Sequence, residues 1–174
     1  MRGTVQDITE RKQMDEALRE SEEKYRNIIE TTNEGIVVID ADLRITYVNK
    51  KLAEKGGYNQ EEVIGRPWWD FTDEEGKAVA KLHMDKRLRG IDEIYELKII
   101  CKDGSPFWML VSSKSLLDKE GKFSGSLSML TDITERKKAE EKIKRLANIV
   151  ESSDDAIVTE SLDGIILSWN NGAE

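Results

Sequence analysis

Residues 35–65 show the clearest pattern of hydrophobic and polar positions in the chain. An apolar run at residues 35–40 and an alternating run at residues 43–49 are both rich in β-branched side chains, and two residues separate them. This arrangement predicts a β-hairpin. Asn49 then stands where a helix N-cap belongs, and residues 50–55 predict a short helix that a glycine pair ends.

Two further short helical segments follow. Asn59 and Glu62 have the spacing of a capping box, so a second short helix is expected to begin there and to stop near Gly65. Residues 67–71 begin with a proline, which is tolerated in the first turn of a helix, and predict a third helical turn.

A longer helix is predicted at residues 73–89. Thr72 and Glu75 have capping-box spacing at its start, and Gly90 is a stop signal at its end. Its apolar face is expected to contain Ala78, Val79 and Leu82.

Three strands are predicted after this helix, at residues 93–101, 106–117 and 123–132. An Asp-Gly pair between the first two favours a tight hairpin. The chain therefore has five predicted strands, with the helices grouped between the second and the third.

An internal repeat extends over much of the chain. The hexapeptide DITERK occurs at residues 7–12 and again at residues 132–137, and the related sequence continues to Asn49 in the first copy and to Asn170 in the second. The second copy is shorter by about one helical turn, which predicts that the variable segment is helical in both.

These features resemble the PAS domain, the small sensory module of signalling proteins. The opening half of the resemblance rests on Gly35-Ile36, Asp40, Ile45, Asn49, Gly57-Tyr58, Glu61 or Glu62, and Gly65. The closing, PAC-type half rests on the hexapeptide followed by a charged helix, the usual exit of such domains. The resemblance implies an α+β fold with a five-stranded antiparallel sheet, helices on one face, and amphipathic linker helices on either side.

The resemblance and the repeat together divide the chain. Residues 1–9 resemble the last strand of a preceding PAS unit, residues 22–134 a complete PAS domain, and residues 151–174 the truncated start of a second one. Linker helices are expected at residues 10–31 and 135–150. Adjoining PAS or kinase domains are therefore expected in the parent protein.

Both predicted linkers have small or apolar residues at heptad spacing, with charged residues around them. The positions are Met14, Leu18, Ser21, Tyr25 and Ile28 in the first linker, and Ala139, Ile143, Leu146 and Val150 in the second. Two interpretations stay open: a helix that forms a homodimer with a partner helix, or an amphipathic helix that packs on its own domain.

Composition narrows the possible classes of function. A net charge of -8 gives no general reason to bind nucleic acid or an anionic membrane, and no apolar run approaches the roughly 20 residues that cross a bilayer. A single cysteine and a single histidine offer neither a Cys/His metal cluster nor a nucleophilic triad, and there is no glycine-rich phosphate loop. We expect a cytoplasmic, non-catalytic protein without a metal site.

The resemblance implies that any ligand lies between the helices and the sheet. Photosensory PAS domains attach flavin through a cysteine on the helix that corresponds to residues 65–71, which contain none, so that photochemistry is excluded. Trp68 and Trp69 leave non-covalent flavin open, and His83 leaves haem open, although structural roles explain all three better. Cys101 is expected to be a small buried apolar residue.

A small organic ligand, or none, is the other alternative, and we expect no tightly bound cofactor. Hydroxyl donors could come from strand residues Ser112, Ser113, Ser115, Ser126 and Ser128, unless these lie on an exposed face.

The function that the resemblance implies is sensing within a multi-domain protein, such as a sensor histidine kinase. Asp132, Ile133 and Thr134 would transmit a signal from the last strand to the following helix, with Thr134 suited to cap that helix. The alternative is a dimerisation or spacer module without a ligand.

Overall fold

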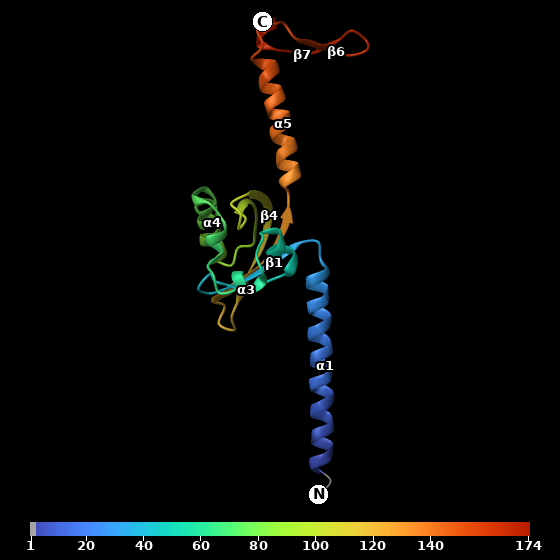
Figure 1. Cartoon of the computed structure of the whole chain (residues 1–174), viewed down its shortest axis with the longest axis vertical. Coiled ribbons are helices and arrows are strands. Elements are labelled where there is room, and N and C mark those ends of the chain that lie inside the picture. Colours follow the sequence, from blue (N-terminus) through green and yellow to red (C-terminus); the bar gives the residue numbers. More distant parts are fainter. Residues whose placement is uncertain (1–2) are drawn as a thin grey trace. The chain divides into compact units, whose positions relative to one another are not determined.

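The computed structural model describes residues 3–174 and divides into two units, residues up to Asp132 and residues Ile133–Glu174. Figure 1 shows the elements of both. Each unit is described by itself below.

The first unit is built on the five-stranded antiparallel sheet that the sequence predicted. Its strands are β1 (Gly35–Asp40), β2 (Ile45–Val48), β3 (Glu93–Ile100), β4 (Pro106–Leu117) and β5 (Phe123–Asp132). The order β2-β1-β5-β4-β3 places the first and last predicted strands of the unit side by side, with Gly35 opposite Leu130.

Four helical segments join β2 to β3: α2 (Lys50–Lys55), α3 (Gln60–Val63), the 3₁₀ turn η1 (Trp68–Phe71) and α4 (Glu74–Arg87). In Figure 1, α3 and α4 lie beside the sheet. Alternate residues of β4 such as Met109 and Val111 are buried towards the helices, whereas Leu127 and Met129 of β5 are exposed on the other face. The predicted α+β fold is confirmed.

Asn49 holds the start of this unit together. Its side chain is fully buried, and its Oδ1 accepts hydrogen bonds from the backbone N–H groups of Ile36 (3.0 Å) and Leu52 (3.2 Å). Its Nδ2 donates to the carbonyl oxygens of Ile29 (3.2 Å) and Glu34 (2.9 Å). The predicted N-cap is confirmed, and the same amide also links α2 to β1 and to the preceding helix.

Two expectations for α4 are wrong. The N-cap is Asp73, whose carboxylate accepts from the N–H of Gly76, while the Thr72 hydroxyl donates to the Lys98 carbonyl of β3 at 2.6 Å. The predicted apolar face is not the buried one, since Leu82 is 61% exposed. The buried residues are instead Gly76, Ala80, Met84 and Arg87.

Small residues explain this choice of face. A Cβ at Gly76 would lie 1.9 Å from the Thr72 hydroxyl, and Ala80 is 1% exposed. The buried face of α4 therefore has small residues at these two positions, where neighbouring atoms pack closely.

The expected strand at residues 1–9 is also wrong, because α1 is one helix from Gly3 to Thr31; residues 1–2 lie outside the described part. A strand needs a partner for its backbone groups, whereas a helix satisfies them internally, and no strand of the described chain pairs with this segment. The end of α1 is tied to the sheet through Glu30, which accepts from the hydroxyl of Tyr47 and the N–H of Lys50, each at 2.9 Å.

The second unit consists of α5 (Thr134–Glu151), a hairpin of β6 (Val158–Glu160) and β7 (Ile166–Trp169), and a 3₁₀ turn (Asn171–Ala173). Ile133 occupies the cap position of α5, so Thr134 belongs to the first turn and is not the cap. Asn170 repeats the role of Asn49: its Oδ1 accepts from Ile157 at 2.8 Å and its Nδ2 donates to Val150 at 2.8 Å. The sequence repeat is therefore a structural repeat.

Candidate functional site

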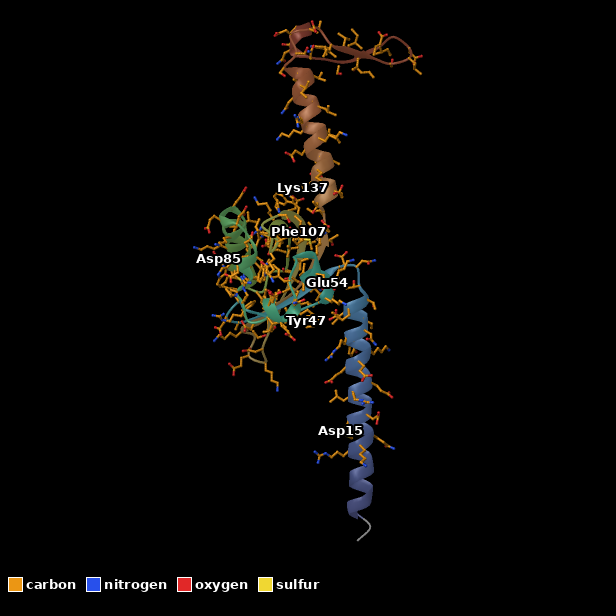
Figure 2. The ribbon with its side chains drawn as sticks, in the orientation of Figure 1. Asp15, Tyr47, Glu54, Asp85, Phe107 and Lys137 are labelled. Atoms are coloured by element: carbon orange, nitrogen blue, oxygen red, sulfur yellow. The ribbon has the colours of Figure 1, made fainter. Side chains whose placement is uncertain are left out.

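A cavity of about 100 Å³ lies between the helices and the sheet of the first unit. Most of its walls are apolar side chains, which come from all five strands, from α2 and from η1. They include Leu52, Leu97, Phe107, Val111 and Leu130. Phe107 is labelled in Figure 2, within the body of this unit. A mainly apolar lining with few polar groups is usual for small-molecule sites, and this cavity is smaller than the roughly 300 Å³ at which such sites usually begin.

Arg87, the last residue of α4, brings a positive charge to this cavity. It is only 5% exposed, and its Nη2 donates to the hydroxyl of Tyr95 at 2.6 Å. Its Nε–H is buried without an acceptor, and no carboxylate pairs with its guanidinium in the part of the chain that the structure describes.

The energetic balance at Arg87 is unfavourable. An uncompensated buried charge costs about 3–5 kcal/mol, and an unpaired buried N–H adds about 1–3 kcal/mol. The C-terminus of a helix returns about 0.3–1 kcal/mol to a nearby cation. The hydrogen bond to the Tyr95 hydroxyl and the cation–π contact of the guanidinium with the Tyr95 ring, 5.6 Å from its centroid, offset a further part. Arg87 is therefore a candidate functional residue, because it lines the cavity and no ion pair of the described chain supplies its counterion.

The sequence gave no indication of Arg87. A basic residue in the last turn of a helix is ordinary, and only the packing of α4 shows that this one is buried.

The candidate serines divide between the two faces of the sheet. Ser113 and Ser128 are buried on the inner face and share a hydrogen bond of 2.6 Å, and the Ser115 hydroxyl donates to the Arg87 carbonyl at 2.8 Å. Ser126 is 1% exposed and its hydroxyl has no partner. Ser112 is exposed on the outer face. Of the five, Ser128 lines the cavity.

His83 does not reach the cavity. Its Nδ1 lies 2.5 Å from a carboxylate oxygen of Glu93, and its ring stacks on Tyr95 at 4.0 Å between centroids. Hydrogen bonds from Lys86 and His83 lower the pKa of Glu93. This histidine therefore joins α4 to β3 and is not placed as a haem ligand in this structure.

The two tryptophans have different surroundings. Trp68 lines the cavity, and its indole N–H is buried without an acceptor, whereas Trp69 packs edge-on against Trp68 at 5.7 Å and is not among the lining residues. A cavity of about 150 Å³ accommodates one benzene ring, so the walls around this smaller space fit neither a flavin ring system nor haem.

The last strand connects the cavity to the predicted junction. Ser128 and Leu130 of β5 line the cavity, and Asp132 ends this strand in an ion pair with Lys55 of α2. Ile133 is buried. The sequence predicted the junction residues but not Lys55, because a lysine in a short charged helix carries no sign of a distant partner.

The heptad positions of both linker helices are exposed in the chain. Met14, Leu18, Tyr25 and Ile28 of α1 have exposed fractions from 56% to 71%. On α5, Ala139, Ile143, Leu146 and Val150 are exposed as well. Within the first unit, the named α1 residues therefore do not pack on the sheet, while for α5 the two interpretations stand as the sequence left them.

Other chemistry finds little support among the described residues. Cys101 is half-buried, less than expected, with its Sγ 3.6 Å from the Lys55 carbonyl. In residues 3–174 no cluster of His, Cys, Asp or Glu is arranged for a metal ion, and none of the helices is both long and apolar enough for a membrane span.

Comparison with protein families gives a match over residues 33–135 to a family described as PAS domain. Sporulation kinase C of Bacillus subtilis is 29% identical over 169 residues, which cover 91% of this chain and 39% of the kinase. A methyl sulfide methyltransferase-associated sensor of Methanosarcina acetivorans is 32% identical over 127 residues, covering 72% of this chain and 12% of the sensor. The chain thus spans less than half the length of either relative.

A similar fold is found among solved structures. The PAS domain of an HTR-like protein from Haloarcula marismortui superimposes with a TM-score of 0.62 at 24% identity, covering 70% of this chain and 99% of that domain.

Proposed function

Because this chain belongs to the PAS domain family, whose fold is sensory and non-catalytic, we propose that it is the sensory module of a sensor histidine kinase. Sporulation kinase C, a kinase by name, supports this assignment of the parent protein. The module perceives a small molecule or a partner and passes the change to α5. The cytoplasmic location expected from the sequence stays a prediction.

One observation carries the proposal: the cavity is bounded by the two elements that meet at Asp132. Leu52 and Ala53 of α2 line it, and so do Ser128 and Leu130 of β5. Lys55 at the end of α2 pairs with Asp132 at the end of β5. A molecule in the cavity that separates α2 from β5 would therefore strain this ion pair, which holds the last residue of β5 two positions before α5 begins.

The exposed heptad residues support the second part of the proposal, a homodimer through α1 and α5. In a dimer, the α5 residues Ile143, Leu146 and Val150 would face a partner helix, and two alternative packings of such a seam would form the bistable element that signalling needs. These same residues also favour the second candidate function, a dimerisation spacer without a ligand. The unpaired N–H groups of Trp68 and Arg87 at the cavity support the sensor.

The test is a fusion of the full chain to the catalytic core of a histidine kinase, with autophosphorylation as the measurement. We expect Asp132→Ala and Thr134→Ala to change the rate about fivefold or more, the lower end of usual allosteric couplings. Asp85→Ala is the matched control, because Asp85 is an exposed carboxylate on α4 (labelled in Figure 2) away from the junction. Unchanged output in both junction variants would exclude the junction as the route.

A further inference from the structure

Two acidic side chains fasten the end of α1 to the rest of the first unit. Glu30, in the last turn of α1, accepts hydrogen bonds from the hydroxyl of Tyr47 (labelled in Figure 2) and from the backbone N–H of Lys50, each at 2.9 Å. Glu34, just after α1, accepts a hydrogen bond from the hydroxyl of Thr131 in β5. The end of α1 is therefore bound both to the beginning of α2 and to the end of β5.

The helix α2 connects this attachment to the exit of the unit. Its first residue, Lys50, is bound by Glu30, and its last residue, Lys55, pairs with Asp132 at the end of β5. The Asn49 side chain that caps α2 also donates to a carbonyl oxygen in the last turn of α1 at 3.2 Å. Six residues form less than two helical turns, about 9 Å, so we expect α2 to move as one piece. A displacement of α1 therefore reaches Asp132 through α2.

These contacts lie apart from the cavity and contribute little to stability. Glu30, Lys55 and Asp132 are not among the residues that line the cavity. The side chains of Lys55 and Asp132 are 36% and 39% exposed, and an exposed ion pair stabilises a fold only slightly. What the contacts do is join the segment where the chain enters the sheet to the segment where it leaves.

The sequence repeat carries the same pair of carboxylates. When the two capping asparagines are aligned, Glu151 and Asp155 stand at the positions of Glu30 and Glu34. Glu151 is the last residue of α5, the helix that follows β5 and precedes the hairpin of β6 and β7. The end of each linker helix thus has the acidic groups that would bind it to the strands that follow. A connection of this kind suits units that are joined in series.

We propose that the first unit also relays movement of α1 to α5 when its cavity holds no ligand. The direct route is the hydrogen bond between Thr131 and Glu34. The second route runs from Glu30 along α2 to the ion pair at Asp132, as a contiguous chain of contacts. The input is then a change in α1 itself, imposed by a partner helix or by a domain before it. This inference rests on the proposed function for its output through α5, whereas the coupling between α1 and the junction is a property of this chain alone.

Hydrogen exchange at the backbone amide of Lys137 measures the coupling in the full chain. This amide donates to the Ile133 carbonyl at 2.9 Å and so reports on the first turn of α5. We expect Glu30→Ala to speed its exchange about threefold, the effect of one weakened hydrogen bond, because α2 then holds Asp132 less firmly. Glu22→Ala removes the same charge from an exposed position of α1 and is expected to leave the exchange unchanged.

A double-mutant cycle separates coupling from a general loss of stability. Distant, independent substitutions have additive effects, whereas substitutions on one route do not. Exchange at Lys137 in the double variant Glu30→Ala/Asp132→Ala is therefore expected to match that in Asp132→Ala alone. Glu34→Ala tests the direct route and should also speed the exchange. Additive effects of the Glu30 and Asp132 substitutions, or unchanged exchange in both Glu30→Ala and Glu34→Ala, overturn the proposal.

The kinase fusion tests the relay separately from the proposed function. A leucine zipper placed before Gly3 turns α1 by about 100° for each alanine added between them. We expect autophosphorylation to vary about fivefold or more with this phase, and Glu30→Ala combined with Glu34→Ala to flatten the response. Output that follows Asp132→Ala but not the zipper phase overturns the relay and leaves the proposed function intact. Coupled exchange in a fusion whose output follows neither refutes the proposed function and leaves the coupling.

Discussion

Replacement of Asn49 by alanine tests the account of how the first unit is held together. The fully buried side chain makes four hydrogen bonds, two accepted from Ile36 and Leu52 and two donated to Ile29 and Glu34. Loss of the N-cap costs about 0.5–2 kcal/mol, and each of the other three bonds about 0.5–1.5 kcal/mol, so Asn49→Ala is expected to lower the free energy of unfolding by about 2–6 kcal/mol.

The assay is urea unfolding followed by tryptophan fluorescence in a Trp169→Phe background, which leaves the remaining tryptophans reporting on the first unit. Asn170→Ala is the matched control, since Asn170 makes the same kind of bonds within the second unit. Asn170→Ala should leave the urea unfolding transition of the first unit unchanged and should speed hydrogen exchange at the backbone amide of Ile157. A loss below about 1 kcal/mol in Asn49→Ala would refute the reasoning, because water would then satisfy the four groups equally well.

Three other predictions use the same chain. In Gly125→Ala the new Cβ would lie 2.2 Å from the Ile39 carbonyl oxygen at a φ of +151°, so urea unfolding should show a loss of about 2 kcal/mol or more. Burial is the larger cause, and the hydrogen bond to Glu30 the next, of the rise in the pKa of Tyr47 to about 12. The stabilising contribution of Tyr47 is therefore present below pH 10 and is lost as the pH rises through 12, and ultraviolet absorbance measures this titration. Leu18→Glu places a charge in the proposed dimer seam and should weaken self-association about tenfold by sedimentation, with folding unchanged.

Each of these has a control or a contradicting result. Gly121→Ala meets no atom within 4 Å, so it separates the strain of a positive φ from the steric clash at Gly125. A Tyr47 that titrates near pH 10 would show that its environment is open to water. A wild-type chain that sediments as a monomer at all concentrations would remove the seam as a dimer contact.

Local rules were sufficient for the elements that depend on neighbours in sequence. The hairpin before Asn49, the cap at Asn49 and the reach of Glu62 back to the N–H of Asn59 all follow from residues within a few positions of one another. These predictions are confirmed.

Features that depend on distant parts of the chain were missed. The apolar pattern of α4 favoured Leu82, but the buried face contains Gly76, Ala80, Met84 and Arg87, and at Gly76 a larger side chain would clash with Thr72. Burial of Arg87 follows from that choice of face. Arg87 was therefore out of reach of sequence reasoning, whereas Trp68 and Ser128, which also line the cavity, were candidates from the sequence, and the family resemblance implied the location between helices and sheet.

The adjacent pairing of β1 and β5 has a mechanical consequence. These strands are antiparallel, with Gly35 at the beginning of β1 opposite Leu130 near the end of β5, so the chain enters and leaves the sheet at the same end of one strand pair. Tension applied between residues before Gly35 and residues after Asp132 would break the hydrogen bonds between β1 and β5 one after another, in an unzipping geometry. A shear geometry would load all of these bonds at once. The first unit would therefore yield to small forces at the end where it connects to its linkers, while the three strands β3, β4 and β5 kept their pairing.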